Sequence, residues 1–410
     1  MSQQGPIIVV ANAERPAFAS ALDEAKLFPV IDLPLADAAT AVVQLQPAAV
    51  LVASSEAIGA AFAALAQRIA ATRPYLPLIA VDPLISLPAN AIPFAQSGGN
   101  FDRLMARLRA ALRVRTLHCT VMRRLDEEPA APAVSADSDP ARDATVLLIG
   151  RGAGYPALSV ALGERIGIVG ALSMEAAARH LNVRDIDGIV LGDGFTPRVI
   201  DVFLTVLAEN ARFRNLPVVV TSPGLTPTHD LPNLEIIAGD PERVAANALP
   251  LIRQHAFEAY LTRSLRSIDA GGLLDPRTGL LTEVAFNRDF ATAVAQTLSK
   301  GGGLSVARFA FDPLHERAQR DGARILSRLM RQMDFGAVWP DGSVIVVFAE
   351  TDLRTAHSIA RRLASVIRQT DSGKRDARSD PAVTLATLQP TDSAQALLAR
   401  LYQEARRAAS

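Results

Sequence analysis

The run Ile7-Ile8-Val9-Val10 near the start of the chain and the run Val146-Leu147-Leu148-Ile149 further along it decide the fold class. Apolar runs of this length are typical of parallel strands that are buried on both faces of a sheet. A second run begins 43 residues after the first in both places, at Val50 and at Ile189. Strands at equal spacing, each followed by a stretch with helical character, predict two copies of one doubly wound parallel sheet.

A third apolar run and a closing amphipathic stretch complete each copy. In the second copy, apolar residues continue at helical spacing to Ile268, which predicts a helical stalk that couples this copy to the rest of the chain. The third runs are Leu78 to Val81 and Val218 to Thr221, and the amphipathic stretches are Phe101 to Leu117 and Pro241 to Leu265.

The domain boundaries follow from composition. Residues 125–143, LDEEPAAPAVSADSDPARD, are rich in Pro, Ala, Ser and Asp and poor in large apolar side chains, so we expect a flexible linker. The prediction is an α/β multidomain protein. Its parts are a first domain at 1–124, the linker, a second domain with its stalk at 144–268, and a third domain at 269–410.

Charge and residue usage exclude several classes of function. With 42 basic and 42 acidic residues the chain has no net charge, so no global field draws it to nucleic acid or to an anionic membrane. Cys119 is the only cysteine, and no pair of histidines has a metal-ligand spacing, so we expect neither disulfides nor a metal site. The chain also lacks a signal-like start and any apolar run near the ~18 residues that cross a bilayer. We therefore expect an unprocessed cytoplasmic protein that binds no nucleic acid and does not insert into membranes.

The two copies resemble response-regulator receiver domains in the spacing of their strands and helices. The resemblance implies a flavodoxin-like sheet with a phosphorylated aspartate after the second buried run, beside an acidic pair that holds magnesium. The phosphoacceptor position falls on Ala53 in the first copy and on Gly192 in the second, where Asp193 stands one place later. Residues 11–13 and 150–152 offer no acidic pair. We expect two degenerate receiver-like domains that serve dimerisation or docking, with Asp193 left open as an alternative phosphoacceptor.

From Gly271 to Ser410 the chain resembles a GGDEF, or diguanylate cyclase, domain. The matching motifs keep the family's order over nearly the whole segment. They are Asp275 to Leu280 for the opening motif, Leu304 to Phe311 for the first central strand, Asp321-Gly322 for a helix start, Trp339 to Val344 for the hairpin of the name motif, Thr384 to Ala386 for the last core strand, and Leu401 to Arg406 for the last helix.

The catalytic positions depart from the family. Its members hold two magnesium ions through an aspartate on the first strand and acids of the hairpin. Here the strand position is Ala310 and the hairpin reads Gly342-Ser343, with Asp312 and Asp341 nearby. An acid displaced by one residue points to the other face of a strand. We expect no catalytic residues, no metal, no cofactor and no enzymatic activity.

The motif Arg331-x-x-Asp334 survives at the family's inhibitory site, and Arg362 falls where the family has a second arginine of that site. The resemblance implies that these three residues bind cyclic di-GMP. An arginine fork can donate to guanine O6/N7 or to phosphate, and a carboxylate can accept from the guanine amide and amino hydrogens. Spacing i, i+3 at a helix end predicts that Arg331 and Asp334 share one face, and a simple helix ion pair is the alternative.

Position distinguishes this motif from chance occurrences. Only Arg331/Asp334 has the family's offset from the hairpin, with residues 335–339 standing between Asp334 and Pro340. The same pattern occurs elsewhere, for example at Arg123/Asp126, Arg184/Asp187, Arg266/Asp269 and Arg368/Asp371.

The resemblance to this family of bacterial signalling proteins implies a non-catalytic cyclic di-GMP effector. It also implies a homodimer, a polar position in the cell, and protein partners in a signalling or proteolysis pathway linked to the cell cycle. Two alternatives remain open: a protein-only scaffold with no nucleotide binding, and a divergent diguanylate cyclase that uses Asp312 and Asp341 to bind metal.

Overall fold

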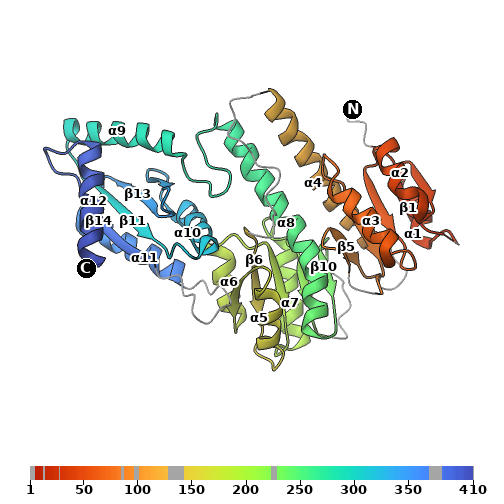
Figure 1. The fold of residues 1–410 in the computed structure, drawn as a ribbon. Coiled ribbons are helices and arrows are strands. Elements are labelled where there is room, and N and C mark those ends of the chain that lie inside the picture. The colour runs from red at the N-terminus through yellow and green to blue at the C-terminus, as the bar shows by residue number, and fades with distance from the viewer. Residues whose placement is uncertain are drawn as a thin grey trace.

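The computed structural model describes residues 5–12, 14–26, 28–84, 87–96, 101–127, 143–222, 229–368 and 381–409. Three β-sheets follow one another along the chain, two of them parallel and one antiparallel (Figure 1). Most of the predicted linker lies outside the described residues. Its first residues are not linker, because helix α4 continues through Glu127.

The first sheet has the strand order β2-β1-β3-β4-β5, with every pair parallel. Helices α1 and α4 pack on one face of the sheet, and α2 and α3 pack on the other. The elements are β1 (Ile7–Val10), α1 (Ala17–Ala25), β2 (Val30–Leu33), α2 (Leu35–Leu45), β3 (Ala49–Val52), α3 (Gly59–Ala70), β4 (Leu78–Val81), β5 (Ala91–Phe94) and α4 (Asp102–Glu127).

The second sheet repeats this design in the order β10-β9-β8-β6-β7. Helices α6 and α7 cover one face, and α5 and α8 cover the other. The elements are β6 (Thr145–Ile149), α5 (Tyr155–Gly163), β7 (Gly167–Ala171), α6 (Met174–Val183), β8 (Gly188–Leu191), α7 (Pro197–Glu209), β9 (Val218–Val220), β10 (Leu234–Ile236) and α8 (Pro241–Asp269).

Both parallel sheets therefore have the order 2-1-3-4-5 of a flavodoxin-like doubly wound fold. The expectation of two parallel α/β sheets is confirmed. The strict alternation of strand and helix breaks once in each repeat, because the described residues between the fourth and fifth strands contain no helix.

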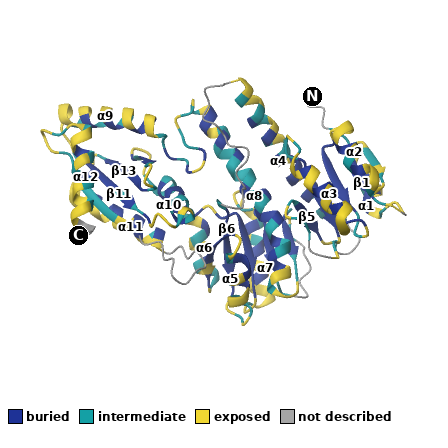
Figure 2. Ribbon diagram, viewed as in Figure 1, coloured by how far each residue is buried: buried dark blue, intermediate teal, exposed yellow. Residues whose placement is uncertain are grey.

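The two repeats pack against each other through their last helices, which lie side by side in Figure 1. Val114 and Val121 of α4 meet Leu261 and Ile268 of α8 in a shared apolar cluster. Leu251 of α8 reaches into the core of the first repeat. Figure 2 shows the buried faces along this contact. Helix α8 is thus both the closing helix of the second repeat and the predicted stalk.

The third sheet is antiparallel in the order β12-β13-β11-β14. Helices α10 and α11 cover one face and α9 and α12 cover the other, around a split βαββαβ core. The elements are α9 (Glu283–Lys300), β11 (Leu304–Ala310), α10 (Glu316–Leu329), β12 (Phe335–Val338), β13 (Val344–Ala349), α11 (Leu353–Arg368), β14 (Ala382–Thr387) and α12 (Ala394–Ala409).

One expected helix boundary in this domain is wrong. Asp321 and Gly322 lie in the middle of α10, which begins at Glu316. The ring of Phe311 packs against the place where a Cβ of residue 322 would stand, so Gly322 serves packing there and does not start a helix. In the parts of the chain that the structure describes, no helix is both long enough and apolar enough to cross a bilayer.

Candidate functional site

Arg331 and Asp334 lie in a tight turn between α10 and β12, and not on a helix face as their spacing predicted. Helix α10 ends at Leu329 because Met330 has extended backbone angles. The backbone N–H of Asp334 then donates to the carbonyl oxygen of Arg331 at 3.0 Å, which closes the turn. The two residues still neighbour each other, and the turn leads directly into the first strand of the hairpin.

Asp334 is buried, with 7% of its surface exposed. Its Oδ1 accepts a hydrogen bond from the backbone N–H of Ala349 at 3.2 Å. Its Oδ2 is also buried, and no group among the described residues donates to it. Burial raises the pKa of the Asp334 carboxyl, and the backbone N–H groups of Ala349 and Arg331, together with the charge of Arg331, offset this only in part. The turn therefore contains a buried acceptor whose donor is missing.

Arg331 and Arg362 are both exposed, and in the described ranges neither side chain has a hydrogen-bond or ion-pair partner. Arg362 lies on the solvent side of α11, whose buried side carries Ile359 and Leu363. The structure brings Arg331 and Asp334 together, whereas among the described residues Arg362 forms no hydrogen bond or ion pair with either of them. Two guanidinium groups are thus available near the α10–β12 turn and on the neighbouring helix.

The hairpin turn between β12 and β13 is held by its own side chains. Asp341 accepts from the backbone N–H and the hydroxyl of Ser343, at 2.9 and 2.6 Å, and from Arg308 at 2.9 Å. Although burial disfavours its charge, these bonds lower the pKa of Asp341 below its usual value. The guanidinium of Arg308 also lies over the ring of Tyr402 at 5.2 Å. Asp341 is therefore engaged within the protein.

Gln319 of α10 lies between this hairpin turn and the loop after β11. Its side-chain nitrogen donates to the carbonyl oxygen of Asp312 at 3.2 Å, and its amide lies against the space where a Cβ of Gly342 would stand. The Asp312 carboxylate accepts from the backbone N–H of Leu314 at 2.9 Å and lies 3.1 Å from the ring of His315. Over the described residues, no three His, Cys, Asp or Glu side chains are grouped to hold a metal ion.

The positions that correspond to a receiver's phosphorylation site are packed by local contacts. In the first repeat, Asn12 donates to Glu56 at 2.6 Å, three residues after Ala53. In the second, the carbonyl oxygen of Asp193 accepts from the backbone N–H groups of Arg151 and Gly152 at 3.1 Å each. Ala13 lies outside the described residues. The described residues of both loops are held by hydrogen bonds from backbone N–H groups or from the Asn12 side-chain amide. None of these bonds places a second carboxylate beside Glu56 or Asp193.

An arginine-rich contact joins the second repeat to α10 and α11, and sequence reasoning missed it. Arg184, 1% exposed, pairs with Asp321 at 2.9 Å and donates to the carbonyl oxygen of Val366 at 2.7 Å. Arg328 donates to Asp185 at 2.9 Å. In the sequence, Arg184 stands out only as part of an R-x-x-D pattern with Asp187. These bonds hold the elements that flank Arg331 and Arg362 against the second repeat.

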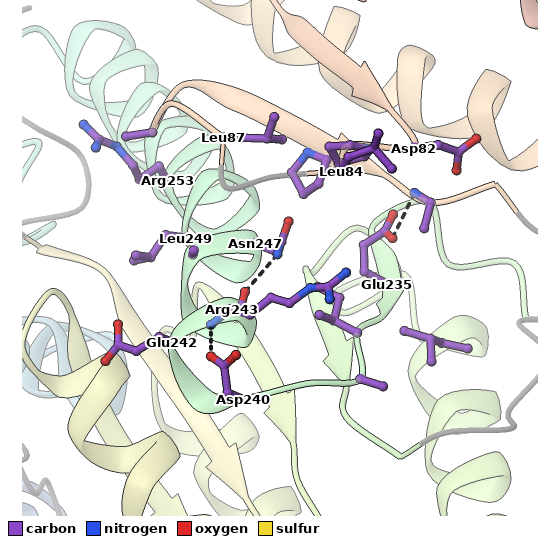
Figure 3. A pocket seen from close by; sticks show the side chains of 18 of the residues that line it. Asp82, Leu84, Leu87, Glu235, Asp240, Glu242, Arg243, Asn247, Leu249 and Arg253 are labelled. Atoms are coloured by element: carbon purple, nitrogen blue, oxygen red, sulfur yellow. Dashed lines mark hydrogen bonds between the residues drawn. The ribbon is translucent and has the colours of Figure 1, made fainter. Parts of the chain in front are cut away.

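A cavity of about 1000 Å³ lies between the two repeats, and none of the predicted site residues lines it (Figure 3). Asp240 caps α8 through the backbone N–H of Arg243 at 2.8 Å, and Asn247 donates to the carbonyl oxygen of Arg243. Glu235 at its wall accepts from Arg107 at 2.8 Å. The cavity is lined by both acidic and basic side chains, and Asp240, Asn247 and Glu235 already form hydrogen bonds that stabilise the fold.

Solved GGDEF domains are among the structures similar to this chain. The coiled coil and GGDEF domain of DgcB from Caulobacter crescentus, in complex with c-di-GMP, is 16% identical, with a TM-score of 0.31 over 36% of this chain and 87% of that one. The FimX GGDEF domain from Pseudomonas aeruginosa is 20% identical, with a TM-score of 0.30 over 33% and 93%. The diguanylate cyclase SiaD of that organism, in complex with its activator SiaC, is 15% identical, with a TM-score of 0.30 over 36% and 64%. No protein-family model and no curated protein matches the chain.

Proposed function

We propose that this protein is a non-catalytic cyclic di-GMP effector. A degenerate GGDEF domain, carried behind two degenerate receiver-like domains, binds the nucleotide at Arg331, Asp334 and Arg362 and passes the signal to protein partners. Titration of the full-length protein with cyclic di-GMP tests the binding step.

The observation that carries this proposal is the buried Oδ2 of Asp334, which has no donor among the described residues. An unsatisfied buried acceptor costs about 1–3 kcal/mol, and a ligand that supplies the missing donor would remove this cost. The guanine edge offers two donors side by side, its ring N–H and its amino group, which match the free positions on a carboxylate. Asp334 is the residue that would select guanine over adenine.

The two exposed arginines supply the second half of the recognition. A guanidinium group forms paired hydrogen bonds with phosphate or with the O6/N7 edge of guanine. Arg331 lies in the same turn as Asp334, and Arg362 lies on α11, which packs beside α10 on the same face of the sheet. Their lack of partners in the described chain leaves both free to bind the ligand's phosphates.

The same geometry argues against turnover of GTP. Two magnesium ions require oxygen ligands, and Asp341 is held by Ser343 and Arg308 while Gln319 fills the space between the hairpin and the Asp312 loop. We expect no detectable cyclic di-GMP when the protein is incubated with GTP and magnesium. Product analysis by mass spectrometry checks this. Product that disappears in an Asp312→Asn variant would establish the divergent cyclase instead.

The order of the three domains is similar to that of the diguanylate cyclase PleD, and the lost active site with a kept R-x-x-D motif is similar to the effector PopA. This resemblance extends the proposal to a cytoplasmic homodimer that acts through partners in cell-cycle control or regulated proteolysis. The bonds from Arg184 to Asp321 and Val366 support a route for the signal, because they join the second repeat to the helices that flank the site.

A further inference from the structure

A second cavity, of about 540 Å³, lies where the second repeat, the stalk helix and the third domain meet. Its walls come from the loop after α6, from α8, from α10 and from residues 274–279. Every residue that lines it belongs to the described chain, and Arg331, Asp334 and Arg362 are not among them. The volume lies in the range of sites for small organic ligands.

The lining carries six arginines against four carboxylates. Two of the carboxylates pair with other arginines and two accept from neutral groups, so the four acids only partly neutralise the six arginines. Asp185 accepts from Arg328 at 2.9 Å, Glu258 accepts from Arg113, which lies outside the cavity, at 2.9 Å, Asp187 accepts from the backbone N–H of Thr145 at 2.9 Å, and Asp275 accepts from the hydroxyl of Thr278 at 2.6 Å.

Three of the arginines, Arg212, Arg263 and Arg266, have no carboxylate partner within the described part of the chain. Arg263 donates only to the carbonyl oxygen of Pro276 at 3.0 Å, and Arg212 donates to that of Arg184 at 3.3 Å. Burial, reinforced by the charge of Arg324, lowers the pKa of Arg263 to about 10. Asp187, Asp185 and Asp143 offset this shift only in part, and a desolvated guanidinium that lacks a direct carboxylate partner is unfavourable, so the cavity wall keeps an excess of positive charge.

We propose that this cavity binds a small phosphate-bearing anion through Arg212, Arg263 and Arg266. Planar guanidinium forks match phosphate oxygens, and three of them facing one hollow suit a compact ligand with two or more negative charges. Because its walls come from three parts of the chain, a bound anion stabilises the docked arrangement over any arrangement that separates them. The site is distinct from the Arg331 turn and stands without it.

The test uses inorganic pyrophosphate as the probe and calorimetric titration of the full-length protein at low salt, without divalent cations. Wild-type protein is expected to bind with one-to-one stoichiometry. Arg266→Met, which removes an exposed side chain with no recorded contact, and Arg263→Met are each expected to weaken binding about tenfold or more. Arg288→Met, on the far helix α9, is the matched control and is expected to bind as wild type.

A companion measurement separates this site from the proposed cyclic di-GMP site. Arg331→Ala protein is expected to bind pyrophosphate with unchanged affinity, so either site can fail without the other. Thermal unfolding of each variant, with and without pyrophosphate, shows whether a loss of binding comes from misfolding. A correctly folded Arg266→Met protein unfolds, without pyrophosphate, in the same transition as wild type. Absence of saturable binding by wild-type protein, or equal binding by wild type and folded Arg266→Met, overturns the proposal.

Discussion

Arg107→Met is expected to lower the free energy of unfolding of the paired repeats by about 3–5 kcal/mol. Arg107 of α4 is fully buried and pairs with Glu235 of β10 at 2.8 Å, while it donates to the carbonyl oxygens of Pro93 and Pro232 at 2.8 and 2.6 Å. Removing the guanidinium leaves the Glu235 carboxylate, 1% exposed, without its ion-pair partner and with only the charge of Arg103 to offset its burial. Urea-induced unfolding followed by circular dichroism measures the loss.

The pH dependence of this variant has a defined sign. Burial raises the pKa of Glu235, and Arg107 opposes that shift, so in the variant the carboxyl takes up a proton more readily. When a carboxyl has a higher pKa in the folded state than in the unfolded state, the free energy of unfolding falls as the pH rises from the lower pKa to the higher one. The deficit of Arg107→Met is therefore expected to be complete above the raised pKa of Glu235 and to shrink as the pH falls from there towards the ordinary pKa of a glutamate.

Two further variants test whether the ion pair between Arg107 and Glu235 accounts for the loss of stability in Arg107→Met. Arg113→Met breaks a partly exposed pair between Arg113 of α4 and Glu258 of α8, and it is expected to cost about 1 kcal/mol or less. Arg107→Met/Glu235→Leu removes both charges and is expected to be more stable than Arg107→Met alone. A double variant no more stable than the single one would show that the Arg107 contacts to carbonyl groups, and not its pairing with Glu235, hold the repeats together.

Asp334→Asn is expected to weaken cyclic di-GMP binding by about 100-fold or more while leaving the fold intact. The amide oxygen can keep the hydrogen bond from the Ala349 N–H, so the turn retains its shape. The amide nitrogen would then stand where Oδ2 now lies and would oppose the guanine donors with a donor of its own. One charge-assisted hydrogen bond, worth about 1.5–3 kcal/mol, is replaced by a contact between two donors, and the other bond to guanine loses its charge.

The matching control is the thermal transition of the same variant, which is expected to stay within about 1 kcal/mol of wild type because the unpaired charge is removed and the Ala349 contact is kept. Isothermal titration of the folded variant gives the affinity. If Asp334→Asn binds cyclic di-GMP as tightly as wild type, the orphaned oxygen of Asp334 does not contact guanine.

In the two parallel sheets, the sequence predicted the central strands and missed the edge strands, for a physical reason. Central strands are covered on both faces, so β1, β3 and β8 are continuous apolar runs. The missed strands β2, β5, β7 and β10 all lie at the edges of their sheets. Edge strands tolerate polar residues, glycine and proline, and these four contain Asp32, Pro93, Gly170 and Glu235.

The candidate site was only partly predictable. The offset from the hairpin identified Arg331 and Asp334, but their spacing suggested a helix face because nothing in the sequence marks the end of α10 at Leu329. The orphaned oxygen of Asp334 depends on the position of Ala349, which only the folded hairpin fixes. The contact between Arg184 and Asp321 joins residues 137 positions apart, and no local pattern encodes it.

Isothermal titration of the full-length protein with cyclic di-GMP, beside Arg331→Ala and the exposed control Arg288→Ala, tests the central claim most directly. The account predicts saturable binding of micromolar affinity or tighter for wild type and for Arg288→Ala, and loss of binding in Arg331→Ala. Absence of measurable binding by the wild-type protein would contradict this account and favour a protein-only scaffold. Unchanged affinity in Arg331→Ala would contradict the assignment of the site.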